Sequence, residues 1–179
     1  MTNPEMAILG LTAQQPLYGY QIEQLIEQRG MREWSEIGFS SIYYILNKLE
    51  AAGLLVSEKQ SGGDRPARKV YQLTPAGRAE LAAAVHERLT KPRPRSGDFD
   101  LALANLPALP PAEALAALQN YRAALAGRLQ RVSAKQQADR SVDGLPPHVE
   151  GLFERSLVLM RAELDWLTGF IQTLDQEPS

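Results

Sequence analysis

The sequence of 179 residues contains no cysteine and only two histidines. The lack of cysteine excludes disulfides, thiolate metal sites and thiol redox switches. His86 and His148 are too far apart in the chain to form a helical pair of metal ligands, so we expect no metal and no cofactor. There is also no Gly-x-Ser-x-Gly nucleophile turn and no histidine grouped with acids on one predicted face. These absences argue against an enzyme.

Long apolar runs are absent too. No apolar stretch approaches the ~20 residues that a membrane-spanning helix needs, and residues 1–5 lack the basic-then-apolar form of a signal peptide. We therefore expect a cytoplasmic protein that does not contact a membrane. The hydrophobic (44%) and charged (22%) fractions are near those of ordinary globular domains. The length allows one core of ordinary size, or a small domain with a helical extension.

The sequence has no overall excess of positive charge. Nineteen lysines and arginines stand against 21 aspartates and glutamates, which gives a formal net charge of −2. This charge is not typical of a protein that binds nucleic acid without regard to sequence. Basic residues gather locally instead, because the run from Arg88 to Arg95 contains several of them and no acid. We expect modest non-specific affinity for nucleic acid, with a marked dependence on salt.

One segment, residues 39–55, has the pattern of a helix that reads DNA. Its apolar positions recur at helical spacing on one face, which consists of Ile42, Ile45, Leu46 and Leu49. The opposite face is short, polar and aromatic, and consists of Ser40, Ser41, Tyr44, Asn47 and Lys48. No carboxylate precedes Glu50 in this segment. Such a face fits the major groove of DNA and presents donors and acceptors to base edges.

Two β-prone runs after this helix predict a hairpin. They are residues 54–59 and 69–73, and the centre between them contains Gly-Gly and a proline. The tip carries Arg65, Arg68 and Lys69 with a single acid among them. A basic tip is typical of a wing that lies on phosphates or probes the minor groove.

Glycine and proline set the limits of the other elements in the first half. We expect a helix that ends at Pro16 and a second helix that ends at Gly30. Gly53 caps the helix that reads DNA, and a further helix runs from Pro75 to about Leu89. Three helices, a hairpin and a fourth helix in this order predict a winged helix-turn-helix domain.

The second half of the chain is helical in pattern. After a short segment at residues 98–106, apolar residues recur at three- and four-residue steps over residues 115–132, and a heptad rhythm follows from Phe153 to Leu174. So wide an apolar face needs partners on more than one side. We predict that one flank packs within the chain and the other against a second subunit. The predicted dimer interface consists of Phe153, Leu157, Met160, Leu164, Leu167 and Ile171.

The sequence therefore predicts a mainly α fold with a small β-hairpin wing, in three parts. A winged helix-turn-helix domain spans residues 1–90, a linker with two prolines and a glycine spans 91–97, and a helical dimerisation and effector domain spans 98–179.

Trp166 allows two interpretations. A tryptophan on a broad apolar helix face belongs most often to a core or an interface. The functional interpretation is a pocket between subunits for a planar aromatic effector, lined by Phe153, Met160, Trp166 and Phe170.

The order and spacing of these segments resemble the PadR family of bacterial transcriptional regulators. The matching stretches are residues 7–11, 17–22, 41–43 with Leu46 and Leu49, 52–54, 65–66 and 68–77. They cover about the first half of the chain, and the resemblance implies a dimeric winged-helix repressor. It also implies that the Tyr43 hydroxyl donates to a phosphate. The complete set of predicted DNA contacts is Tyr18, Ser40, Ser41, Tyr43, Tyr44, Asn47, Lys48, Arg65, Arg68 and Lys69.

Two functions follow from these patterns. The first is a sequence-specific regulator of transcription, a repressor that binds double-stranded DNA as a homodimer on a pseudo-palindromic operator. The alternative is a protein-interaction module, in which the winged helix binds another protein and the helical half serves as a dimeric scaffold. The alternative predicts binding that is indifferent to salt and to the wing arginines, and the basic wing tip favours the first function.

Overall fold

The structure is a computed structural model that describes residues 1–31, 42–62, 65–91 and 97–176, with residues 61–62, 65–67 and 142–143 described by their backbone alone. The chain divides into two compact units, residues 1–94 and 95–179. The fold is mainly helical with one small antiparallel sheet, which confirms the fold class predicted from the sequence.

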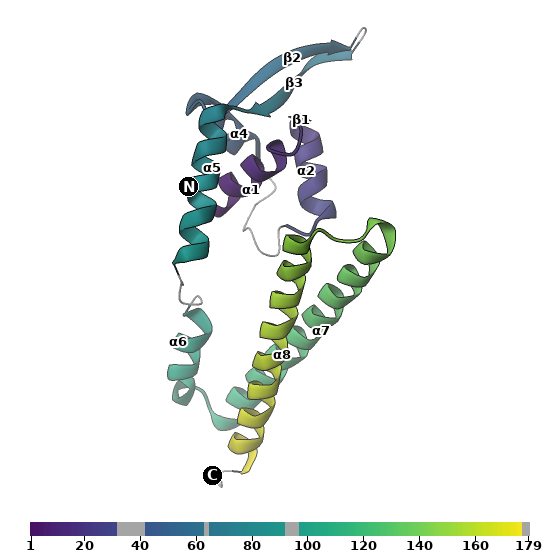
Figure 1. Ribbon diagram of the computed structural model, residues 1–179. Helices are drawn as coiled ribbons and strands as arrows, with labels where there is room; N and C mark the ends of the chain where they lie inside the picture. The colour runs from purple at the N-terminus through teal and green to yellow at the C-terminus, as the bar shows by residue number, and fades with distance from the viewer. Residues whose placement is uncertain (32–41, 63–64, 92–96, 177–179) are drawn as a thin grey trace. The chain divides into compact units, whose positions relative to one another are not determined.

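The first unit is a winged helix. Its described elements are α1 (Asn3–Thr12), β1 (Leu17–Tyr18), α2 (Gly19–Gln28), α4 (Ile42–Ala51), β2 (Leu55–Gly62), β3 (Arg65–Leu73) and α5 (Pro75–Thr90). The strands β2 and β3 form a hairpin that extends past the helices of this unit (Figure 1). The predicted hairpin is confirmed, and so is the helix that was expected to begin at Pro75.

The sheet has one strand more than the hairpin predicted from the sequence. Its order is β1-β3-β2, and β1 pairs with β3 through Leu17 opposite Tyr71 and Tyr18 opposite Val70. A strand of two residues is too short to show a period of alternation. This strand places the start of α2 directly beside the wing.

The core of the first unit joins all of its helices to the sheet. The inner face of α4 is buried as predicted, and its Ile42, Ile45, Leu46 and Leu49 are at most 7% exposed. Fully buried side chains from the other elements complete the core, and they are Ile8, Leu9, Ile22, Ile26 and Leu55. Because one face of α4 is held in this way, its other face has a fixed orientation toward solvent.

Capping residues fix where helices of the first unit begin and end. Thr2 and Glu5 form a capping box at the start of α1. The Thr74 hydroxyl accepts a hydrogen bond from the Gly77 N–H at 2.9 Å and so begins α5. Gly53 has φ +70° after α4, as a C-terminal cap requires.

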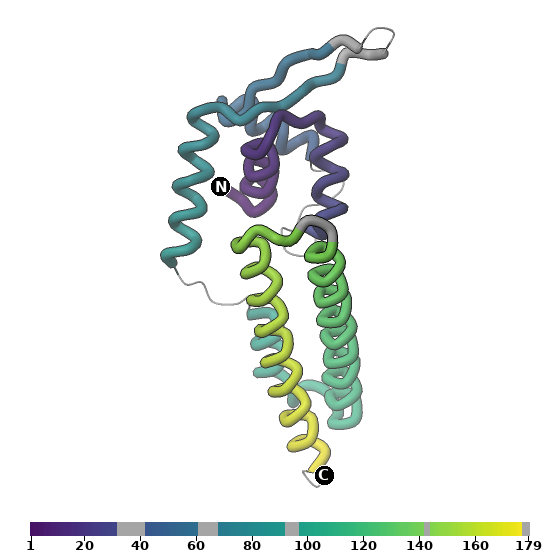
Figure 2. Tube along the Cα trace, turned by 45° about the vertical axis from the view of Figure 1, so that its right-hand side comes forward, coloured from purple at the N-terminus to yellow at the C-terminus, as the bar shows by residue number. Residues whose placement is uncertain are grey.

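The second unit is a helical hairpin with a short helix packed against it. Its elements are α6 (Asp98–Ala104), a short 3-10 helix η2 (Leu106–Ala108), α7 (Pro111–Asp143) and α8 (Pro147–Gln176). Helices α7 and α8 lie side by side and run in opposite directions (Figure 2). The turn between them contains Gly144 with φ +71°, a backbone conformation that glycine adopts without a Cβ penalty.

The heptad face of α8 packs within the chain. Leu167 and Ile171 form one buried cluster with Leu118 of α7, and Leu157 and Met160 form a second one with Leu125 of α7. Leu164 is partly buried beside the second cluster. The sequence prediction placed these side chains between two subunits. In the structure, α7 of the same chain covers Leu157, Met160, Leu167 and Ile171.

The described ranges contain no helix with the length and apolar character needed to cross a membrane. In those same ranges, no group of three or more His, Asp or Glu side chains is placed to hold a metal ion.

Candidate nucleic-acid interface

The outer face of α4 is exposed and polar, as the spacing predicted. Tyr43 is 54% exposed and Tyr44 is 70% exposed, and Asn47 and Lys48 are exposed one turn further along the helix. Ser40 and Ser41, which the sequence analysis also assigned to this face, lie outside the described residues. The described part of the face therefore offers two phenol groups, one amide and one amine.

A groove of about 570 Å³ lies where β1, the start of α2, the start of α4 and β3 meet. Its walls are mainly aromatic and carry two cationic side chains, and the residues that line it are Tyr18, Gly19, Tyr20, Tyr43, Arg68, Lys69 and Tyr71. Four of the predicted contacts, namely Tyr18, Tyr43, Arg68 and Lys69, are therefore brought together from three separate stretches of the chain.

Gly19 allows the close approach that forms one wall of this groove. A Cβ atom on Gly19 would lie 2.7 Å from Cε1 of Tyr43, which is closer than real Cβ contacts come. The Tyr43 ring therefore packs directly on the first turn of α2, and this contact fixes the direction of its hydroxyl. Sequence reasoning did not find this role of Gly19.

The wing is tied to the start of α2 by polar and aromatic contacts. The Tyr18 hydroxyl donates a hydrogen bond to Oε1 of Gln60 at 2.8 Å. The Tyr18 and Tyr20 rings are stacked with centroids 5.7 Å apart, and the Arg68 guanidinium lies 5.4 Å from the centroid of the Tyr20 ring. These contacts hold the base of the wing against α2.

Tyr20 and Tyr71 are functional candidates that sequence reasoning missed. Tyr20 is 39% exposed and lies next to Arg68, whereas Tyr71 is buried and forms the floor of the groove. Burial raises the pKa of the Tyr71 phenol, so this group stays protonated. The repeated tyrosine in the Tyr-Gly-Tyr stretch at residues 18–20 was the available signal, but its meaning depends on the pairing of β1 with β3.

Both lysines of the predicted set have carboxylate partners. Nζ of Lys48 lies 2.6 Å from Oε1 of Glu5 on α1, and Nζ of Lys69 lies 2.9 Å from Oε2 of Glu50 on α4. The second oxygen of Glu50 accepts a hydrogen bond from the Ser57 hydroxyl on β2. Glu50 thus joins the last turn of α4 to both strands of the wing.

These contacts shift the pKa values of the groups involved. The pKa of the Glu5 carboxyl is lowered, chiefly because Lys48 donates a hydrogen bond to it and the backbone of Thr2 donates another. The pKa of Lys48 is raised, first by that same hydrogen bond. The pKa of Glu50 is lowered by the hydrogen bonds from Ser57 and Lys69. The Glu5 and Glu50 carboxylates and the Lys48 amine therefore stay ionised near neutral pH.

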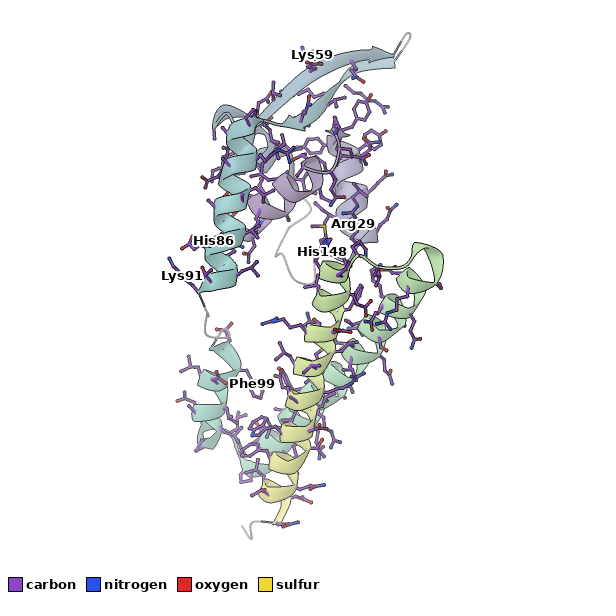
Figure 3. All side chains as sticks on the ribbon, in the orientation of Figure 1. Arg29, Lys59, His86, Lys91, Phe99 and His148 are labelled. Atoms are coloured by element: carbon purple, nitrogen blue, oxygen red, sulfur yellow. The ribbon has the colours of Figure 1, made fainter. Side chains whose placement is uncertain are left out.

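Arg65 is the first residue of β3, and the structure describes its backbone only. Lys59 lies on β2, the opposite strand of the wing (Figure 3). Taken together, the amide of Asn47 suits base edges, whereas the tyrosine hydroxyls and the cations beside them suit phosphate oxygens.

Within a single chain, the four side chains predicted to line an effector pocket between subunits do not come together. Trp166 stacks on Phe170 with ring centroids 5.3 Å apart, and it meets the edge of Phe99 at 6.2 Å. Met160 belongs to the other buried cluster. Phe153 and Trp166 are about 20 Å apart along α8, since an α-helix rises ~1.5 Å per residue. The four side chains therefore do not line one cavity.

Trp166 and Phe170 instead belong to a group of four aromatic side chains in contact with one another. Phe99 of α6 (Figure 3) stacks on Tyr121 of α7 at 4.5 Å, so the group consists of Phe99, Tyr121, Trp166 and Phe170. Trp166 is 45% exposed. The other three rings are partly buried against the core cluster, so α8 exposes the Trp166 ring at the edge of this aromatic group.

Comparison with known proteins gives a match in sequence for the first unit and a match in fold for both units. Residues 8–83 match the model of the transcriptional regulator PadR-like family. The chain is 40% identical over 74 residues to the transcriptional regulator Rv3488 of Mycobacterium tuberculosis, and the match covers 41% of this chain and 64% of that protein. The match thus spans less than two thirds of the length of this relative.

Solved structures extend the likeness in fold to nearly the whole chain. Bacillus subtilis PadR in complex with operator DNA has a TM-score of 0.74 and 22% identity, over 95% of this chain and 96% of that chain. The same protein in complex with p-coumaric acid has a TM-score of 0.73 and 20% identity, over 97% and 99%. At these identities the likeness concerns the fold, including the helical hairpin of the second unit.

Proposed function

Because residues 8–83 form a domain of the PadR-like family of transcriptional regulators, we propose that this protein is a sequence-specific repressor that binds operator DNA as a homodimer. The observation that carries this proposal is the exposed polar face of α4 beside the groove of tyrosines and cations at the base of the wing. A DNA-reading helix with a basic wing next to it is the arrangement of a winged-helix protein on DNA. The family is one of regulators and not of enzymes.

Within this proposal the side chains divide by chemistry. Asn47 reads a base through its amide, and Ser40, Ser41 and Tyr44 belong to the same major-groove face. Tyr43 donates its hydroxyl to a phosphate beside the groove, and Arg65 and Arg68 contact the DNA backbone further along. Tyr18, whose hydroxyl donates to Gln60, borders the same phosphate site. The uncharged residues then set specificity, whereas the arginines set affinity and its dependence on salt.

Two-fold symmetry of the homodimer leads to a pseudo-palindromic operator. The two copies of α4 enter successive major grooves, so the half-sites lie about 10 base pairs apart, one turn of the double helix. Helix α8 provides the exposed apolar residues that suit a second subunit, namely Leu152, Val158 and Trp166. They replace the buried heptad residues as candidates for the dimer interface.

A small-molecule effector is the remaining part of the proposal. The complex of Bacillus subtilis PadR with p-coumaric acid shows that a protein of this fold takes a planar aromatic acid. In this chain, the aromatic group around Trp166 is the surface that favours a ligand of that shape. A ligand there changes operator affinity if it alters how the two subunits pair.

DNase I footprinting on the DNA upstream of the protein's own gene tests the proposal. The expected result is protection of two half-sites about 10 base pairs apart, with binding that weakens steeply as salt increases. A folded dimer that protects no neighbouring promoter would contradict the proposal. Binding to a protein that is indifferent to salt and to Arg68→Ala would favour the protein-interaction module instead.

A further inference from the structure

The two lysines at the candidate DNA interface are held by carboxylates from their own chain. Lys48 contacts Glu5 at 2.6 Å, and Lys69 contacts Glu50 at 2.9 Å. The sequence analysis treated both lysines as DNA contacts. The partner of Lys48 lies on α1, far away in the sequence, so the pattern of α4 alone could not reveal it.

The members of the Lys48 pair differ in their freedom to move. The Glu5 side chain is 10% exposed, whereas the Lys48 side chain is 55% exposed. The second carboxylate oxygen of Glu5 accepts the Thr2 N–H at 2.7 Å in the capping box of α1. The Glu5 carboxylate is therefore held in place by its own helix, and the more exposed Lys48 side chain extends to it.

This asymmetry decides what happens when DNA approaches. If Lys48 turned to a phosphate, it would leave a largely buried carboxylate without its cation, and a buried unpaired charge is strongly unfavourable. That carboxylate would also lie close to a negatively charged phosphate. Lys48 therefore stays with Glu5, and the pair presents almost no net charge to the DNA.

We propose that Glu5 is a specificity-determining residue, an internal counter-ion that keeps Lys48 from binding phosphates. This inference rests on the proposed function and adds a role that no DNA-contacting residue supplies. Non-specific binding depends on the number of phosphates that the protein neutralises, whereas base reading by Asn47 does not. On random DNA the protein can shift until a free lysine meets a phosphate, whereas on the operator base reading by Asn47 fixes its register. Withholding Lys48 should therefore lower affinity for random DNA more than affinity for the operator.

The variant Glu5→Gln tests this role without removing the cap. Glutamine serves at this position of a capping box, because its side-chain oxygen still accepts the N–H of Thr2. It lacks the negative charge that holds Lys48. Each released lysine adds about 0.9 to the steepness of log Kobs against log salt, or about 1.8 for a dimer. Random-sequence DNA should therefore lose roughly tenfold more affinity between 50 and 200 mM salt with this variant than with the wild type.

Two control variants test whether a change in salt dependence comes from the release of Lys48. In Glu5→Gln/Lys48→Gln the released charge is removed again, so the salt dependence should return to that of the wild type. Glu154→Gln makes the same change of net charge at an exposed position of α8 in the other unit, and it should leave the salt dependence unchanged. Fluorescence anisotropy of a labelled random duplex and of the footprinted operator gives both affinities, and circular dichroism verifies that each variant is folded.

The outcomes separate this inference from the proposed function. A steeper salt dependence of Glu5→Gln, reversed by Lys48→Gln and accompanied by a smaller ratio of operator to random affinity, supports the role of Glu5. If the wild type binds DNA but Glu5→Gln is no steeper than Glu154→Gln, Glu5 is not a counter-ion and the inference is wrong. If folded wild type and all variants bind no duplex at low salt, the proposed function fails and this inference fails with it.

Discussion

A Cβ atom on Gly77 would lie 2.1 Å from the carbonyl oxygen of Leu54. The first turn of α5 therefore packs against the backbone at the start of the wing. The same carbonyl accepts hydrogen bonds from the N–H of Thr74 at 3.1 Å and from its hydroxyl at 3.1 Å. This contact couples α5 to the end of α4 and the start of β2, so the position of the wing depends on a residue that has no side chain.

Gly77→Ala should destabilise the first unit by about 2–3 kcal/mol, the upper range for overpacking, because the obstructing atoms are backbone and have little room to move. Gly10→Ala is the matched control, since a Cβ there meets nothing within 4 Å, and it should stabilise α1 by about 0.5–1 kcal/mol. Urea unfolding measures both. Equal stability of the two variants would show that the contact at Leu54 is not tight.

Stability should fall in acid because of Glu5 and Glu50. The pKa of each carboxyl is lowered in the folded protein, so the unfolded chain binds protons more readily. Their contribution is present in full above the unfolded value, near 4.5, and is lost as the pH falls through the folded values. Urea unfolding from pH 7 to pH 3 should show this loss, and Glu5→Gln should reduce its size.

Sequence patterns predicted those parts of the fold that are decided by neighbours in the chain. The two faces of α4 follow from the helical spacing of Ile42, Ile45, Leu46 and Leu49, and Gly53 and Thr74 lie where caps were expected. The strand β1 could not be predicted in this way, because two residues have no period and pair only after β3 has formed.

The pairings between distant segments could not be obtained from the sequence. A heptad pattern states that Leu157 and Leu167 need an apolar partner, but it does not state whether that partner is α7 of the same chain or a second subunit. Likewise, the outer face of α4 shows that Lys48 is exposed, but not that Glu5 lies beside it. The site is therefore predictable as a list of residues on one face and not as a network of charges.

Gly19→Ala should weaken DNA binding through Tyr43. The added methyl group displaces the Tyr43 ring, whose Cε1 would lie 2.7 Å away, and with it the hydroxyl that we assign to a phosphate. We expect a loss of about 1.5–3 kcal/mol in operator binding, the size of a hydrogen bond to a charged group. In a Tyr43→Ala background, the same substitution should have almost no further effect. Additive losses in the double variant would show that Gly19 acts independently of Tyr43.

Asn47 and Arg68 should differ in the kind of change that their loss produces. Asn47→Ala should weaken operator binding by about 1–3 kcal/mol and relax specificity at a single base position, because an asparagine amide pairs with adenine in the major groove. Arg68→Ala should weaken all sequences evenly and reduce the salt dependence by about one unit for each subunit. Anisotropy titrations against a set of single-base operator variants distinguish the two. Altered base preference from Arg68→Ala with none from Asn47→Ala would reverse the assignment of roles.

Trp166 should report on an aromatic effector, because its ring is 45% exposed and stacks on Phe170 at 5.3 Å. A planar aromatic acid extends such a stack, whereas the buried clusters of α7 and α8 leave it no room. In a Trp34→Phe variant, only Trp166 fluoresces, so titration with p-coumaric acid and other planar aromatic compounds should quench the emission. Linkage requires that a compound which releases the operator binds the DNA-free protein more tightly than the complex. Trp166→Leu keeps an apolar side chain for the proposed dimer interface but removes the ring, so it should abolish release while the dimer still binds the operator. A compound that releases the operator equally well from Trp166→Leu would place the effector site elsewhere in the protein.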